Sequence, residues 1–120
     1  MNFQTAISTC LSKYATFSGR APRSEFWWFY LFTALVDIIM AVIDGATDMG
    51  GALVALGHLG LLLPSLAVGA RRLHDIDRSG WWQLILFIPL VGWIILLYWL
   101  TRPTQPGPNR FGDEPRTVAF

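Results

Sequence analysis

The chain has 120 residues, of which 53% are hydrophobic and only 14% are charged, and its net charge is +1. A water-soluble domain of this size needs more polar surface than this composition supplies, and the balanced charge argues against bulk binding of nucleic acid. The single cysteine, Cys10, excludes an internal disulfide and any metal site built on paired thiolates. The composition therefore indicates a membrane protein.

The first expected element is an amphipathic helix over residues 3–17. Its apolar side chains recur at helical spacing, and polar side chains occupy the opposite face. The apolar positions are Phe3, Ile7, Cys10, Leu11, Tyr14 and Phe17. Because the segment is too polar to cross a bilayer, we expect it to lie in the membrane interface. The alternative is a helix folded against the cytoplasmic end of a bundle.

Three apolar stretches follow, over residues 26–43, 50–70 and 81–100. A helix rises about 1.5 Å per residue, so roughly 20 apolar residues match a hydrocarbon core of about 30 Å. Tryptophan pairs near the starts of the first and third stretches are typical of the headgroup level. We predict an all-α integral membrane bundle of three transmembrane helices, with residues 1–120 forming a single membrane domain.

Two of these stretches contain proline. Pro64 is expected to distort the second helix locally, and Pro89 and Gly92 are expected to bend the third. A re-entrant pair over residues 81–100 is the alternative, but each half would be too short to cross the membrane. We therefore predict one span there, followed by an extended, proline-rich tail over residues 101–120.

The distribution of Lys and Arg predicts an orientation. The N-terminal segment and the connector between the second and third spans carry three each, the first connector carries none, and the tail carries three. With three spans, six of these charges lie on one side and three on the other. The positive-inside rule then places the N-terminus in the cytoplasm and the tail outside.

The strongest candidates for binding or catalysis lie in two polar segments, residues 19–25 and 71–80, on the expected cytoplasmic side. Arginines at headgroup level can hold phosphate in a bidentate manner, so these segments are candidates for binding lipid headgroups or a partner. The candidate residues are Arg20, Arg23, Glu25, Arg71, Arg72, His74, Asp75 and Arg78. We hypothesise that Glu25 pairs with one of the later arginines and closes this end of the bundle.

Residues 71–80 have three alternatives to headgroup or partner binding. The arginines can serve structure and topology alone. His74 and Asp75 can act as acid and base in an enzyme whose substrate is a phosphate-bearing lipid. A metal site would need more ligands than one histidine and the two flanking acids, Asp75 and Asp77, provide.

Two ionisable residues, Asp37 and His58, fall inside the apolar stretches. Such a group costs about 2.5–3.5 kcal/mol at bilayer depth, so it normally faces a partner. Their depths on antiparallel helices agree to within roughly 2 Å, which predicts a hydrogen bond between them. The pair can hold the hairpin together or, in a small transporter or channel subunit, contribute to a proton or ion path.

Three segments of the chain match a known family. They are residues 19–27 (GRAPRSEFW), 71–82 (RRLHDIDRSGWW) and 106–112 (PGPNRFG). On these segments the chain resembles the bacterial inner-membrane family called domain of unknown function 805, to which YhaH-like proteins belong. The resemblance implies a protein of the bacterial cytoplasmic membrane, with no catalytic residue to carry over. We expect a non-enzymatic membrane component that binds lipid or a membrane partner, self-associates, and uses neither cofactor, metal nor nucleic acid.

Overall fold

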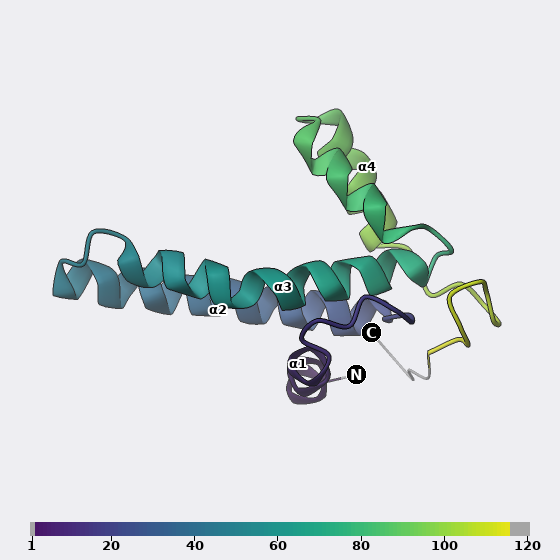
Figure 1. Ribbon diagram of the computed structural model, residues 1–120, viewed down its shortest axis with the longest axis horizontal. Helices are drawn as coiled ribbons and strands as arrows, with labels where there is room; N and C mark the ends of the chain where they lie inside the picture. Colours follow the sequence, from purple (N-terminus) through teal and green to yellow (C-terminus); the bar gives the residue numbers. More distant parts are fainter. Residues whose placement is uncertain (1, 116–120) are drawn as a thin grey trace.

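The computed structural model describes residues 2–115, and all the regular elements within that range are helices. They are α1 (Phe3–Ser12), α2 (Arg23–Thr47), α3 (Ala52–His74), the 3-10 helix η1 (Gly80–Phe87) and α4 (Val91–Leu100). Helices α2 and α3 form a long hairpin, and α1 lies across it (Figure 1). Helix α4 projects from the end of the hairpin at which α3 finishes.

The hairpin turn is built around Asp44. Asp44 lies in the last turn of α2, and its carboxylate accepts hydrogen bonds from the N–H groups of Gly51, Leu53 and Val54 at 2.7, 2.9 and 3.4 Å. These N–H groups at the start of α3 have no partner within the helix, so Asp44 caps it from outside. Gly51 has φ +93°, a backbone conformation that glycine adopts at no steric cost.

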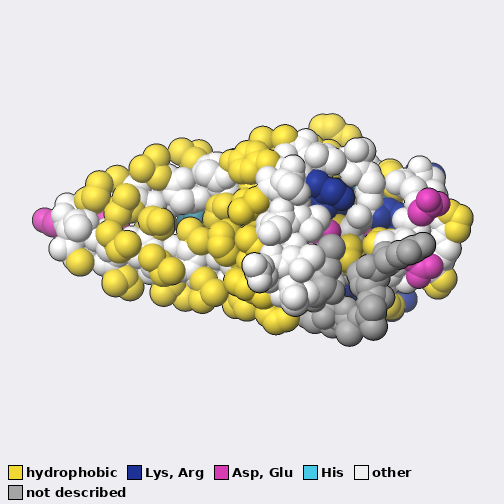
Figure 2. Space-filling model, turned by 90° about the horizontal axis from the view of Figure 1, so that it is seen from below, with side chains coloured by type: hydrophobic (Ala, Val, Ile, Leu, Met, Phe, Trp, Pro, Cys, Tyr) yellow, Lys and Arg dark blue, Asp and Glu magenta, His cyan; other side chains and the backbone are white. Residues whose placement is uncertain are grey.

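Helices α2 and α3 are both long and apolar enough to cross a membrane. In the most apolar 18 residues of each, only 6% and 22% of the residues are buried, so neither resembles the core helix of a soluble domain. Hydrophobic side chains cover the shaft of the hairpin, and the basic side chains gather towards one end (Figure 2). A surface this apolar is suited to lipid and not to water.

Pro64 lies inside α3 and has no N–H group to donate to the carbonyl of Gly60, four residues earlier. The hydroxyl of Tyr14, from the segment after α1, donates a hydrogen bond to this carbonyl. In an apolar environment an unpaired backbone carbonyl is costly, so Tyr14 compensates for the proline. The helix continues through Pro64 to His74, four residues beyond the predicted span 50–70.

The predicted span 81–100 is not one helix. It divides into η1 and α4, which run out and back around a turn at Pro89 and Leu90. Proline disfavours the helical conformation in the residue before it, and Ile88 is extended at φ −98° and ψ 100°. A Cβ atom at Gly92 would lie 1.9 Å from the carbonyl oxygen of Ile85, so glycine allows the two arms to close together.

This turn places the tail at the same end of the molecule as the N-terminal segment. The Trp27 indole donates to the carbonyl of Leu100 at 3.0 Å, and the N–H of Gln105 donates to the carbonyl of Asp75 at 3.2 Å. The prediction of one helix over residues 81–100 that carries the tail to the opposite end is therefore wrong, and three transmembrane helices are not confirmed. The physical reason is that residues 80–100 return to the end from which they start.

Candidate functional site

Three arginines and two acids from separate elements form what we call the buried ion-pair cluster: Arg20, Glu25, Arg71, Arg72 and Asp75. Arg71 pairs with Glu25 and also donates from Nε to the carbonyl of Thr16 at 3.1 Å. Arg72 Nη1 lies 2.6 Å from Asp75 Oδ2, and Arg20 Nε lies 3.0 Å from Asp75 Oδ1. The hypothesis that Glu25 pairs with an arginine of the second segment agrees with this arrangement.

The cluster also holds the tail in place. The Arg20 guanidinium donates to the carbonyls of Gln105 at 2.6 Å and Gly107 at 2.7 Å. Arg72 donates to the carbonyls of Leu100 and Arg102 at the end of α4. The three segments that carry the family resemblance, far apart in sequence, thus meet in one place.

Burial separates the predicted arginines into two groups. Arg71 and Arg72 have no exposed surface and Arg20 is 8% exposed, so their guanidinium groups are not available to a lipid headgroup. For these three, the structure supports the alternative of an internal structural role. Buried charges need partners, and each of these arginines has a carboxylate partner.

His74 and Asp75 do not share a cleft. The Asp75 carboxylate is occupied by Arg20 and Arg72, whereas His74 Nδ1 lies 2.9 Å from the carbonyl oxygen of Gly19. The His74 ring stacks on Phe111 of the tail, with the ring centres 3.9 Å apart and the planes 2° apart. This geometry does not bring the predicted acid and base to one substrate. Within residues 2–115, no group of three or more His, Cys, Asp or Glu is placed to hold a metal ion.

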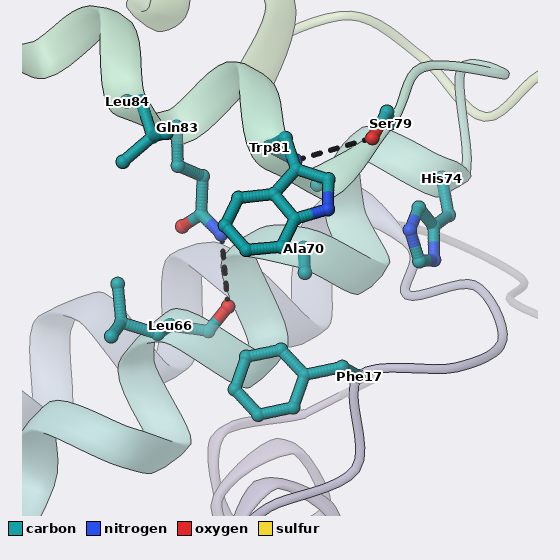
Figure 3. Close-up of a pocket in the computed structure, with 9 residues that line it drawn as sticks. Phe17, Leu66, Ala70, His74, Ser79, Trp81, Gln83 and Leu84 are labelled. Atoms are coloured by element: carbon teal, nitrogen blue, oxygen red, sulfur yellow. Dashed lines mark hydrogen bonds between the residues drawn. The ribbon is translucent and has the colours of Figure 1, made fainter.

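An apolar cavity of about 420 Å³ lies beside His74, between the end of α3 and η1 (Figure 3). Phe17, Leu66, Trp81 and Leu84 line it, and Gln83 spans one side by donating to the carbonyl of Leu66 at 3.1 Å. Its lining suits a hydrocarbon group and not a charged one.

The exposed arginines form a different site, which we call the arginine cleft. Arg78 and Arg102 line a mostly polar cleft of about 390 Å³. The Arg78 guanidinium lies 4.4 Å from the centre of the Trp99 ring, and that of Arg102 lies 5.3 Å from the centre of the Tyr98 ring. Within residues 2–115, neither forms an ion pair with a carboxylate. Two cations held on aromatic faces without counter-ions are suited to an anion.

Asp37 and His58 contact each other, as their depths predict. Asp37 Oδ1 lies 2.9 Å from His58 Nε2, and the two side chains are 41% and 63% exposed. The pair therefore lies on the outer surface of the hairpin and not in its interior.

Arg23, the remaining candidate, begins α2 and donates to the carbonyl of Thr101 at 3.3 Å.

Sequence reasoning missed several contributors. Arg102 was counted only among the three basic residues of the tail, and Asp44 was not singled out. The tail was expected to be extended, yet Asn109 donates to the carbonyl of His74 at 3.0 Å. The available signal was the motif at residues 106–112, whose polar and glycine residues imply a specific contact that composition alone does not locate.

The fold and this polar end define an all-helical integral membrane protein whose basic groups are concentrated at one end. The family described as "Protein of unknown function (DUF805)" matches residues 14–113, and the chain belongs to it. The "Inner membrane protein YhaI" of Escherichia coli K12 is 45% identical over 109 residues, covering 88% of this chain and 91% of the relative.

Two further Escherichia coli K12 proteins are similar. The "Inner membrane protein YhaH" is 40% identical over 111 residues, covering 88% of this chain and 92% of the relative. The "Uncharacterized protein YiiR" is 34% identical over 82 residues, covering 68% of this chain and 53% of that protein. No solved structure matches the chain.

Proposed function

We propose that this protein is a non-enzymatic component of the bacterial inner membrane that binds phosphate-bearing lipid headgroups at the arginine cleft. The observation that carries the proposal is the pair Arg78 and Arg102, which lie over the rings of Trp99 and Tyr98 at an open polar cleft and have no carboxylate partner within residues 2–115. Stacking orients each guanidinium and leaves its N–H groups directed to a ligand. A phosphate group accepts two such hydrogen bonds from each planar guanidinium.

The membrane placement follows from length and charge. Helices α2 and α3 cross the bilayer, and α1 lies in the interface at the basic end. Helix η1 has 8 residues and α4 has 10, which correspond to about 16 Å and 15 Å, so the pair enters and returns without crossing. Tryptophan and tyrosine residues of α4 then lie at headgroup level, where the arginine cleft meets lipid phosphate.

The backbone at the tip of this re-entrant pair supports its immersion in lipid. Pro89 has no N–H group, and the N–H groups of Ile88, Val91 and Gly92 donate to nearby carbonyls at 2.9, 2.8 and 3.1 Å. These three N–H groups are thus satisfied within the turn, as an apolar environment demands.

The same placement predicts the orientation. All eight Lys and Arg residues within 2–115 belong to segments at or leading to one end, and the Asp44–Asp48 turn at the other end has none. The positive-inside rule then puts both the N-terminal segment and the tail in the cytoplasm. A C-terminal green fluorescent protein fusion should fluoresce, and alkaline phosphatase inserted after Asp48 should be active. An active C-terminal phosphatase fusion would contradict this topology.

Lipid binding is tested on the purified protein by native mass spectrometry with phosphatidylglycerol as the probe. Replacing Arg78 and Arg102 together by glutamine should lower the bound phosphatidylglycerol at least five-fold. The matched control is Arg110→Gln, because the Arg110 side chain is 62% exposed and pairs with Asp77, and it should bind like wild type. Unchanged retention by the double variant would overturn the proposal.

Inorganic phosphate distinguishes a lipid headgroup from free phosphate as the ligand. If the cleft recognises the lipid, millimolar phosphate should displace little phosphatidylglycerol, because the hydrocarbon chains add affinity. Complete displacement by phosphate, or equal binding of phosphate without lipid, would show that the soluble anion is the ligand.

A further inference from the structure

The outer face of the α2–α3 hairpin carries a polar pair far from either end. Asp37 lies ten residues, or about 15 Å, before the end of α2 at Thr47. With α2 and α3 across the bilayer, this distance puts Asp37 and its partner His58 close to the middle of the hydrocarbon core. The two side chains are nevertheless 41% and 63% exposed.

The contact between Asp37 and His58 uses only part of their hydrogen-bonding capacity. Asp37 Oδ1 and His58 Nε2 lie 2.9 Å apart, while Asp37 Oδ2 and His58 Nδ1 form no hydrogen bond within residues 2–115. Ionisable side chains at this depth normally face protein or a water-filled cavity, because lipid tails offer no hydrogen bonds. A single copy of the chain therefore leaves this face incomplete.

The surroundings of the pair allow another helix to approach. Asp37 and His58 lie in an open groove of about 330 Å³, and Thr33, Gly57 and Ser65 are among the residues lining it. Small residues at a helix surface let backbones come close together in a membrane.

We propose that this groove is the interface of a two-fold symmetric dimer of the chain. Copies inserted in the same orientation carry their polar pairs at the same depth, so a two-fold axis along the membrane normal brings one pair against the other. In the dimer, Asp37 Oδ2 of each copy then faces His58 Nδ1 of the other copy. A second copy has a polar pair at the same membrane depth by symmetry, whereas an unrelated partner would need its own polar group at that depth.

Cysteine cross-linking in native membrane vesicles tests the face. In a Cys10→Ser background, Leu62→Cys introduces a thiol one helical turn from His58, on the side of the groove. The matched control is Leu56→Cys, about 200° around α3 from His58. Leu62 is 53% exposed and Leu56 is 64% exposed, so accessibility does not favour the groove position.

Mild oxidation should cross-link Leu62→Cys to a dimer at least ten-fold more efficiently than Leu56→Cys. Equal efficiencies, or cross-linking of Leu62→Cys to a different protein, would overturn the proposal. Both variants retain Asp37 and His58, so this comparison does not depend on a destabilised hairpin.

Native mass spectrometry in lipid nanodiscs tests the role of the polar pair. The Asp37→Leu/His58→Leu variant should raise the dimer dissociation constant at least ten-fold over wild type. Wild-type protein that stays monomeric at every protein-to-lipid ratio, or that forms rings of three or more, would overturn the two-fold dimer. The Arg78→Gln/Arg102→Gln variant should dimerise like wild type, so failure of lipid binding and failure of the dimer are separately recognisable.

Discussion

Arg20 Nε lies 3.0 Å from Asp75 Oδ1, although 55 positions separate the two residues, and their side chains are 1% and 0% exposed. This contact joins the segment before α2 to the end of α3. The second oxygen of Asp75 receives Arg72, and the same arginines hold the tail through its carbonyls. The Asp75 carboxylate therefore links the segment before α2, the end of α3 and, through its two arginines, the tail.

Replacing this carboxylate should destabilise the protein strongly. Asp75→Asn removes the counter-ion of two buried arginines, and an uncompensated buried charge costs about 3–5 kcal/mol. We expect a markedly lower melting temperature in detergent, and faster proteolysis of the tail, because Arg20 and Arg72 lose the group that positions them. Asp77→Asn is the control, since its pair with Arg110 is exposed and such pairs contribute about 0–1 kcal/mol. Similar melting of the two variants would contradict the assigned role.

The contact between Tyr14 and α3 predicts a second effect. Tyr14→Phe removes the hydroxyl that donates to the Gly60 carbonyl, and an unsatisfied backbone acceptor costs about 1–3 kcal/mol. We expect a lower melting temperature and faster amide exchange in α1. The variant Tyr14→Phe/Pro64→Ala should regain stability, because alanine restores the N–H group within the helix. No recovery in the double variant would show that Tyr14 acts in another way.

Asp44 should control the start of α3. Asp44→Ala removes the acceptor for three N–H groups, and loss of such a cap costs roughly 0.5–2 kcal/mol. Amide exchange at Leu53 and Val54 should accelerate more than exchange near Leu73, at the other end of the helix. Asp48→Ala would not serve as a control because Asp48 has φ +56°, so Asp48→Asn is used and should leave these amides unchanged. Uniform acceleration along α3 would point to general destabilisation.

Gly92 should be essential for the return of α4. In Gly92→Ala, the new Cβ atom would lie 1.9 Å from the carbonyl oxygen of Ile85, which forces η1 and α4 apart. We expect proteolysis of the tail to become faster and the Trp82–Trp99 ring contact to be lost, with a change in tryptophan fluorescence. The control Gly45→Ala meets nothing within 4 Å and should behave like wild type. An unaltered spectrum in Gly92→Ala would exclude the close approach.

Cys10 reports whether α1 is docked, and its behaviour depends on pH. Burial, and secondarily the nearby Glu25 carboxylate, raise the pKa of the Cys10 thiol from 9.0 to about 12. Because the pKa is raised in the docked state, the protonated thiol stabilises that state below pH 9. This stabilisation is lost as the pH rises from 9 towards 12. Maleimide labelling of Cys10 should therefore be slow at pH 7 and accelerate above pH 9. Ser8→Cys in a Cys10→Ser background, on the exposed side of α1, should label quickly at pH 7.

Sequence and structure agree best where a residue's role depends on local spacing. Helical spacing placed Asp37 and His58 at one depth, and the two side chains are in contact. The prediction of one helix over residues 81–100 failed because the path of the chain there depends on a turn and a close backbone contact, which local spacing does not reveal. Counting apolar residues measures the length available to cross a membrane, but Pro89 and Gly92 determine whether the chain uses that length in one direction.

The order of residues alone indicated apolar stretches of membrane length with basic groups at their boundaries, because hydrophobic length and charge are properties read along one dimension. The structure reduced the three predicted spans to two helices of that length. Only the tertiary structure decided which arginines are internal and which face outwards. Arg72 and Arg78 are six positions apart and of the same residue type, yet one is fully buried against Asp75 and the other is exposed on Trp99. The difference arises from partners brought by the tail and by α4, whose positions depend on a close backbone contact at Gly92.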